Sequence, residues 1–130
     1  MQDFKKILAW QKSHEQFLDV YKVTETFPRD EAYRLTDQLR RAVDSVKTNV
    51  AEGAGKPGER EFRKYVSDSI ASQFEVENHL ISARDLKYLP LNDFERLNAR
   101  GHEIRRMLVS LRRRLSETLK PIPLPKLGEK

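Results

Sequence analysis

The stretch FERLNARGHEIRRMLVSLRRRL, residues 94–115, decides the fold of this chain. Its apolar and small residues recur at alternating steps of three and four, which is the heptad spacing of a helix that packs against other helices. They are Phe94, Leu97, Gly101, Ile104, Leu108, Leu111 and Leu115. We therefore expect one long helix, which Asn92 caps at its start and which ends near Leu119, before the alternating prolines of residues 121–125.

The sequence before this stretch predicts three more helices, each with an apolar seam. The first spans residues 4–26, follows Asp3 as its N-cap, and has its seam at Ile7, Trp10, His14, Phe17, Tyr21 and Thr24. The second runs from the N-cap Asp30 to Glu52, with an apolar face formed by Leu35, Leu39, Ala42, Val43, Val46 and Val50. The third spans residues 59–87 and is expected to bury Phe62, Val66, Ile70, Phe74, Leu80 and Ile81.

Proline and glycine mark the connections between these helices, near residues 28–30, 53–58 and 88–92. Short connections between helices of similar length favour antiparallel neighbours. We therefore predict an all-α fold, an up-and-down antiparallel four-helix bundle over residues 1–120. A proline-rich C-terminal tail over residues 121–130 should follow it.

The composition narrows the class of protein. The chain has 130 residues, of which 35% are charged and 38% hydrophobic, and this suits one domain with a periodic core. It contains no cysteine, so disulfides and thiolate chemistry are excluded. The first residues lack the apolar segment of a signal peptide, and no apolar run approaches the roughly 20 residues of a membrane span. A cytoplasmic location without membrane contact is the expectation.

The positive charge of the chain is concentrated in its last third. The formal net charge is +5, yet residues 1–90 carry 15 Lys/Arg and 15 Asp/Glu. Six arginines of the last predicted helix fall outside its apolar seam: Arg100, Arg105, Arg106, Arg112, Arg113 and Arg114. Such a basic face suits phosphate binding, but also a solvated surface or a subunit contact with acidic residues. No aromatic residue interleaves with these arginines, so base stacking is not expected on this face.

A second polar feature flanks the apolar face of the second predicted helix. It consists of Gln38, Arg41, Ser45, Asn49 and Glu52. On the third predicted helix, Glu77 falls within the apolar arc, and a buried carboxylate needs a partner. Arg84, Arg41 or Arg40 is expected to supply it. These residues indicate either a polar network between helices or subunits, or a ligand or catalytic pocket.

Motifs for catalysis or cofactor binding are missing from the sequence. The three histidines, His14, His79 and His102, do not follow the glutamate of a Glu-x-x-His di-metal motif. His14 is interpreted as a core residue. The segment Gly53-Ala54-Gly55-Lys56 lacks the spacing of a phosphate-binding loop. We expect no catalytic residue, no metal site and no cofactor.

Several segments resemble one known family. Leu8-Ala9-Trp10-Gln11-Lys12, then Tyr21, Thr24, Phe27-Pro28 and Glu31, are similar to the opening of bacterial four-helix-bundle proteins encoded in intervening sequences of 23S ribosomal RNA genes, also labelled S23 ribosomal proteins. Residues 35–53 match that family most closely, through its pattern Gln-Leu-Arg-Arg-Ala, Ser and Asn-x-Ala-Glu-Gly. The similarity continues through Ser72, Glu75, Glu77, Leu80, Ala83 and Leu86. One departure is Ala71-Ser72, where the family usually has Gly-Ser.

The resemblance implies a relation to the accessory proteins of diversity-generating retroelements. Those proteins form five-membered rings and bind a reverse transcriptase and nucleic acid. By this resemblance, the chain is expected to form a homo-oligomer, a pentamer. The wide apolar arc of the third predicted helix favours self-assembly independently, because a core-facing helix needs a stripe of only about 100°.

Two hypotheses for function follow. The first is a non-enzymatic, self-assembling bundle that binds RNA or a nucleic-acid-bound protein through the basic face of the last helix. The alternative is a protein-binding scaffold with no nucleic-acid contact, whose basic face meets an acidic partner. An enzyme would need Glu77, Asn49 and Glu52 to converge on an open cleft, and no small-molecule substrate is evident.

Overall fold

A computed structural model describes residues 1–118 as one short 3-10 helix and four α-helices. These are η1 (Phe4–Lys6), α1 (Leu8–Thr24), α2 (Arg29–Ala54), α3 (Glu59–Asp85) and α4 (Leu91–Thr118). No β-strand occurs within residues 1–118, and the predicted all-α four-helix bundle is confirmed. The predicted helix end near Leu119 and the tail of residues 121–130 lie outside the described residues.

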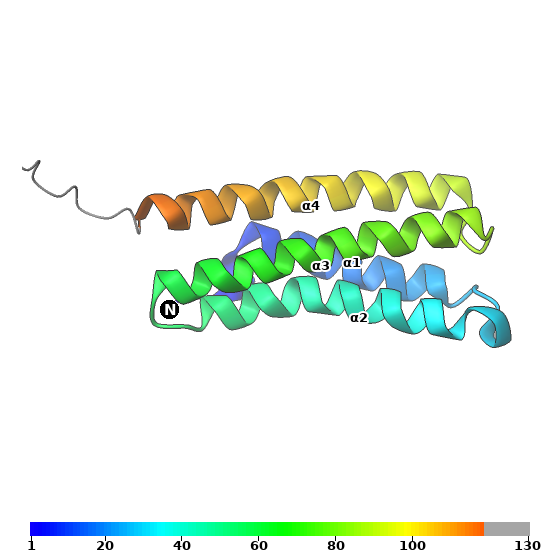
Figure 1. The fold of residues 1–130 in the computed structure, drawn as a ribbon, viewed down its shortest axis with the longest axis horizontal. Coiled ribbons are helices and arrows are strands. Elements are labelled where there is room, and N and C mark those ends of the chain that lie inside the picture. Colours follow the sequence, from blue (N-terminus) through cyan, green and yellow to red (C-terminus); the bar gives the residue numbers. More distant parts are fainter. Residues whose placement is uncertain (119–130) are drawn as a thin grey trace, which may run out of the picture.

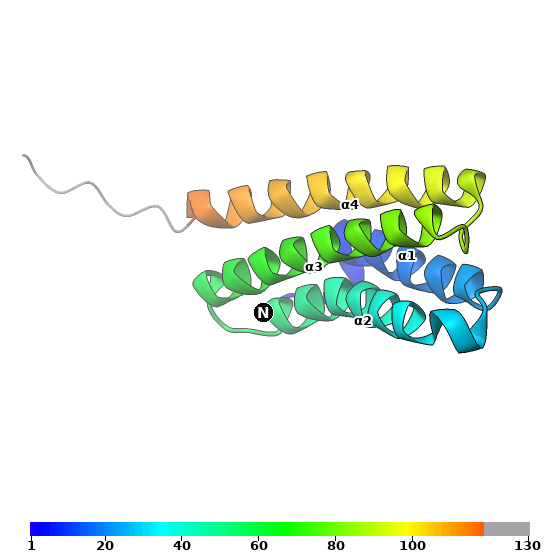
Figure 2. The same ribbon diagram turned by 45° about the vertical axis from the view of Figure 1, so that its right-hand side comes forward.

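The four α-helices lie along one long axis and alternate in direction (Figures 1 and 2). Helix α1 packs against α2 and α4, and α3 packs against the same two helices. The connections α1–α2 and α3–α4 lie at one end of the bundle, and α2–α3 lies at the other (Figure 1). The three connections, residues 25–28, 55–58 and 86–90, overlap the predicted breaks but are shifted or shortened by a few residues.

Prolines, rather than the predicted caps, begin α2 and α4. The Pro28 carbonyl accepts a hydrogen bond from Ala32 N at 2.8 Å, and the Pro90 carbonyl accepts one from Phe94 N at 2.9 Å. Asp30 and Asn92 were therefore wrong as N-caps, because each lies inside the first turn. Asp30 still helps there, since a carboxylate in the first turn interacts favourably with the helix dipole.

The first predicted helix is divided in two. Asp3 caps the 3-10 helix η1, where its Oδ1 accepts from Lys5 N at 3.1 Å. Ile7 is extended, with φ −82° and ψ 120°, and α1 begins at Leu8. The N-terminal segment is held against α2, because Gln2 N donates to the Ala54 carbonyl at 2.8 Å.

The heptad seam of α4 is confirmed in full. Its residues Phe94, Leu97, Gly101, Ile104, Leu108, Leu111 and Leu115 are all buried. The apolar face predicted for α2 is likewise confirmed for Leu39, Ala42, Val43, Val46 and Val50. Leu35 packs against this core but is only partly buried.

The seam predicted for the first helix was correct only in part. Thr24 is buried, whereas Ile7, Trp10 and Phe17 are only partly buried against the core and Tyr21 is exposed. The buried face consists of Ala9, Ser13, Gln16, Val20 and Thr24. Small side chains let the neighbouring helices approach, and the Ser13 and Thr24 hydroxyls each donate to a backbone carbonyl of α1 at 2.6 Å. The large rings of the predicted seam lie beside this face instead. They include His14, which is half-buried and not a core residue.

Two of the six residues expected in the core of α3 are exposed, Phe74 and Ile81. A helix has 3.6 residues per turn, so every exact step of four drifts by about 40°. Three such steps lead from Phe62 to Phe74, and the drift carries Phe74 off the core face. Ser69, Gln73, Val76 and Ala83 are buried on α3 instead.

A pair of glutamines occupies the centre of the bundle. Gln16 of α1 and Gln73 of α3 are almost fully buried, and each amide nitrogen donates to the other residue's oxygen, at 2.8 and 3.0 Å. Gly101 of α4 lies against this pair, because a Cβ there would come within 2.8 Å of Gln73 Nε2. Three helices therefore meet at this pair of glutamines: α1 and α3 through hydrogen bonds, and α4 through close packing.

Helices α2 and α3 approach closely at Gly53, which lies in the last turn of α2 rather than in the predicted loop. A Cβ on Gly53 would come within 2.8 Å of both Phe62 Cδ1 and Tyr65 Cβ. Tyr65 Cβ cannot rotate away, so a larger residue at this position must push the two helices apart.

We predict that Gly53→Ala destabilises the fold by about 1–3 kcal/mol, the usual range for overpacking a tight contact. Gly55→Ala is the matched control, because its Cβ would meet only carbonyl oxygens at 3.5 and 3.7 Å. The control should be neutral or gain up to about 1 kcal/mol, since alanine restricts the unfolded chain. Urea denaturation measures both changes, and equal effects at the two positions would contradict the close approach.

Candidate nucleic-acid interface

The arginines of α4 lie on both sides of its buried seam. One side of the seam faces α1 and the other faces α3. Four of the six predicted arginines line a groove with a volume of about 530 Å³ between α3 and α4, which we call the α3–α4 groove. Its lining residues are Ile70, Phe74, Arg105, Arg106, Val109, Ser110, Arg112 and Arg113. One of the four arginines, Arg106, also lines a groove on the α1 side of α4.

Arg105 is held in this groove by Glu77 of α3. Its Nη1 lies 2.9 Å from Glu77 Oε2, and His102 Nε2 lies 3.0 Å from the other carboxylate oxygen. The Arg105 guanidinium also lies over the ring of Phe74, 4.8 Å from its centroid. The charge of Arg105 is therefore partly compensated, and its position is fixed by two contacts.

The partners expected for Glu77 were wrong, although its pairing with an arginine is confirmed. Glu77 faces α4, so Arg105 reaches it. Arg84 instead pairs with Asp85 at 2.8 Å and lies over the ring of Phe94. The Glu77 side chain is 27% exposed, which is less burial than a core carboxylate would have.

Arg106 and Arg113 are the unpaired cations of the groove. Both are exposed, and neither makes a hydrogen bond or ion pair with the described part of the chain. Arg112 has one long hydrogen bond, in which its Nη1 donates to Ser67 Oγ at 3.4 Å, and it has no carboxylate partner in the described part of the chain. The groove thus combines fixed and free guanidinium groups.

The other two predicted arginines lie away from this groove. Arg100 Nη1 is 3.5 Å from Asp19 of α1, a carboxylate that also accepts two hydrogen bonds from Arg96. Hydrogen bonds to Asp19 and then Asp93 raise the pKa of Arg96 above its usual value. Arg114 lines a second groove, between α1 and α4, with a volume of about 340 Å³.

Of the polar residues predicted along the flank of α2, only Ser45 and Asn49 form a hydrogen-bonded cluster. Ser45 Oγ lies 2.8 Å from Ser72 Oγ of α3, and Asn49 Nδ2 donates to the Ser45 carbonyl at 2.9 Å. Gln38, Arg41 and Glu52 are exposed, and Arg41 pairs with Asp37 at 3.2 Å. These residues do not converge with Glu77, whose contacts are on α4. The Ala71 position at which the chain departs from the family pattern is exposed.

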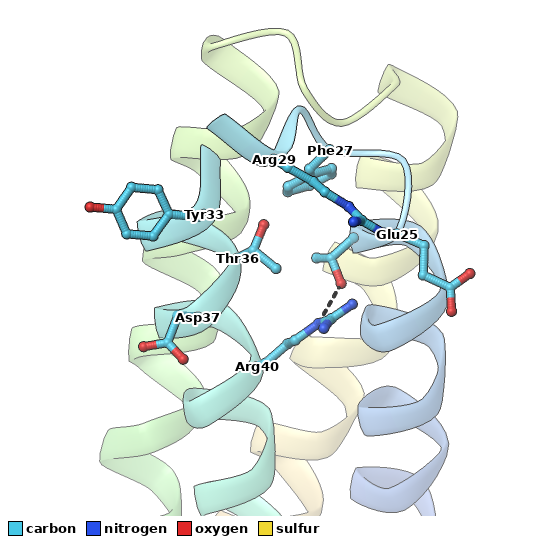
Figure 3. Close-up of a pocket in the computed structure, with 8 residues that line it drawn as sticks. Glu25, Phe27, Arg29, Tyr33, Thr36, Asp37 and Arg40 are labelled. Carbon is cyan, nitrogen blue, oxygen red and sulfur yellow. Dashed lines mark hydrogen bonds between the residues drawn. The ribbon is translucent and has the colours of Figure 1, made fainter. Parts of the chain in front are cut away.

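A pocket at the α1–α2 corner is a feature that sequence reasoning missed. Its volume is about 570 Å³, and Thr24, Glu25, Phe27, Arg29, Tyr33, Thr36, Asp37 and Arg40 line it (Figure 3). Arg40 Nε donates to Thr24 Oγ1 at 2.9 Å, while Tyr33 points away from Arg40 (Figure 3). Two arginines and two carboxylates balance here, so the pocket has no strong charge preference.

A row of aromatic rings along α1 was also missed as a unit. The rings of Trp10 and His14 stack with their centroids 5.0 Å apart, and Phe17 stacks on His14 at 6.0 Å. Lys47 of α2 covers this row, with Nζ 3.1 Å from His14 Nδ1 and 4.5 Å from the Phe17 centroid. The 3-4 spacing of these residues predicts a core seam, whereas the rings lie beside the buried face of α1.

Within residues 1–118, no three acidic or histidine side chains gather closely enough to hold a metal ion. None of the described helices combines the length and apolar character that crossing a membrane requires.

Comparison with known proteins places the chain in a family. The 23S rRNA-intervening sequence protein family matches residues 5–110. A crystal structure of a protein of unknown function from the S23 ribosomal protein family of Bacteroides thetaiotaomicron has a similar fold, with a TM-score of 0.73 and 20% identity. The match covers 80% of this chain and 97% of that one. No curated protein matches the chain in sequence. Because the family match spans most of the sequence, this chain is a member of the 23S rRNA-intervening sequence protein family.

Proposed function

We propose that the chain is a non-enzymatic protein that assembles with itself and binds the backbone of RNA along the α3–α4 groove. The observation that carries this proposal is the convergence of four arginines on one groove. Two of them, Arg106 and Arg113, are exposed and have no partner in the described part of the chain. A guanidinium group binds phosphate through paired hydrogen bonds, and an exposed group loses no existing contact when it does so.

The charge distribution supports a polyanionic partner. The chain carries a net charge of +5, and residues 1–90 contribute none of it. A cationic groove attracts polyanions over a distance and holds them by releasing their counterions.

Self-assembly is supported by apolar side chains that the single chain leaves in water. Leu8 and Leu18 of α1 are 54% and 55% exposed. Burying such side chains at an interface stabilises it by about 25 cal/mol per Å² of apolar surface. A ring of five, which the resemblance implies, would repeat the α3–α4 groove in every subunit, so weak contacts with one RNA strand would add through multivalency.

An acidic protein is the second candidate partner. Arg105 already binds the carboxylate of Glu77, and Ile70, Phe74 and Val109 give the groove an apolar floor. Acidic and apolar side chains of a partner helix would match both features. RNA remains the first candidate, because its repeating phosphates match all four arginines.

We predict that the protein sediments as an oligomer at micromolar concentration. The exposed leucines of α1 should be covered by a second copy, so the mass should be a multiple of 15.3 kDa, and five times that mass for the expected ring. Analytical ultracentrifugation measures it directly. A single species of 15.3 kDa would contradict the proposed assembly.

We predict that replacing Arg106 and Arg113 together by Gln weakens RNA binding and reduces its salt dependence. Each lost phosphate contact should make the slope of log K against log salt less negative by about 0.7 for a single strand. The matched control is Arg29→Gln with Arg34→Gln, which removes the same charge from exposed positions on α2. Within the described residues α2 does not contact α4, so this control should barely change the slope.

Glu77→Gln provides a test with the opposite sign. It removes the carboxylate that compensates Arg105, so affinity for RNA should rise and the salt slope should steepen. Fluorescence anisotropy titrations at two salt concentrations give both quantities for all variants. The nucleic-acid proposal fails if the wild type shows no salt-dependent binding, or if the groove and control variants behave alike.

A further inference from the structure

The floor of the α3–α4 groove is apolar, which phosphate binding alone does not require. Ile70 and Val109 lie at its base, and Phe74 is 53% exposed beside them. Together, these three side chains form a contiguous apolar patch rimmed by polar residues, which is typical of a binding surface. The groove therefore offers an aromatic and apolar surface inside a ring of arginines. From this arrangement, and resting on the proposed function, we propose that the groove binds unpaired nucleobases, which stack on Phe74 while the arginines hold the flanking phosphates.

Phe74 is held in a position that suits stacking. The Arg105 guanidinium lies over its ring at 4.8 Å, and Glu77 fixes that guanidinium at 2.9 Å. The ring is therefore oriented before any ligand binds, while more than half of the residue still faces solvent. Proteins that bind single strands combine a cationic groove with aromatic rings on which bases stack. No aromatic residue interleaves with the arginines along α4, and the ring beside Arg105 comes from α3 instead.

The size of the groove fits this ligand. Its volume of about 530 Å³ lies within the range of about 300–1,000 Å³ that is usual for sites that bind small organic groups. A base with its sugar has this scale. Arg106 and Arg113 line the same groove and have no other partner in residues 1–118, so they remain available for the phosphates on either side.

The geometry distinguishes single strands from duplexes. In a duplex the bases are stacked on one another inside the helix, so no base face is free to stack on Phe74. A single strand places phosphates on the arginines and a base on Phe74 at the same time. The groove should therefore bind a single strand more tightly than a duplex with the same number of phosphates.

The other aromatic surface of the protein does not offer this site. The rings of Trp10, His14 and Phe17 already stack on one another, and Lys47 covers two of them. Their faces are occupied within the fold. Phe74 has no ring partner among the described residues, and although Arg105 lies over its ring, more than half of the residue is left to a base.

The test compares three fluorescent RNA probes: a 12-nucleotide single strand, an abasic strand with the same number of phosphates, and a duplex. Wild-type protein should bind the base-bearing strand about 5- to 150-fold more tightly than the abasic strand, the range for one stacked base. Phe74→Leu keeps an apolar side chain but removes the ring, so most of that preference should disappear. Its binding to the abasic strand and the duplex should not change.

Tyr33→Leu is the matched control, because Tyr33 is an exposed aromatic residue of α2 outside the groove. It should keep the full preference for the base-bearing strand. Equal binding of the base-bearing and abasic strands by wild-type protein would overturn base stacking and leave backbone binding intact. No binding of any probe at low salt would overturn the proposed function as well. If Phe74→Leu dissociates the oligomer in sedimentation, Phe74 belongs to a subunit interface and the stacking site is wrong.

Discussion

The amide pair between Gln16 and Gln73 is the contact on which the arrangement of the bundle depends. It lies across the centre of the bundle, where each glutamine satisfies the other through two hydrogen bonds. A buried amide without a partner costs about 1–3 kcal/mol, so a shift of either helix that separates the pair is penalised. An apolar core alone tolerates sliding far better. Gly101 of α4 adds a third constraint, because any larger residue would displace Gln73.

This central contact also decides what the protein presents on its surface. Successive residues of a helix are turned by 100°, so directing Gln73 toward the centre directs Phe74 away from the core. Glu77 lies one turn farther along α3 and reaches Arg105, which lies one turn beyond Gly101 on α4. The contact between Gln16 and Gln73 therefore determines which residues of α3 and α4 line the groove on the surface. The aromatic ring and the arginines of the groove are placed by the same register.

The sequence predicted the parts of the fold that depend on periodicity and on proline and glycine. The seam of α4 was correct because most other residues of that helix are charged or polar, so no second apolar face competes with it. Periodicity failed where the buried residues are polar or small, as at Ser13 and Gln16, since the larger rings beside them suggested another face. The partner of Glu77 and the ring of Phe74 in the groove were not predictable, because each depends on which side of α3 faces α4.

A double-mutant cycle on the amide pair tests this account most directly. Methionine is unbranched and has the length of glutamine, so Gln16→Met and Gln73→Met each strand one buried amide while keeping the packing. Each single variant should lose about 1–3 kcal/mol of stability in urea denaturation. The double variant should lose less than the sum of the two, which gives a coupling energy of at least about 1 kcal/mol. Strictly additive losses would contradict the claim that this pair sets the register of the bundle.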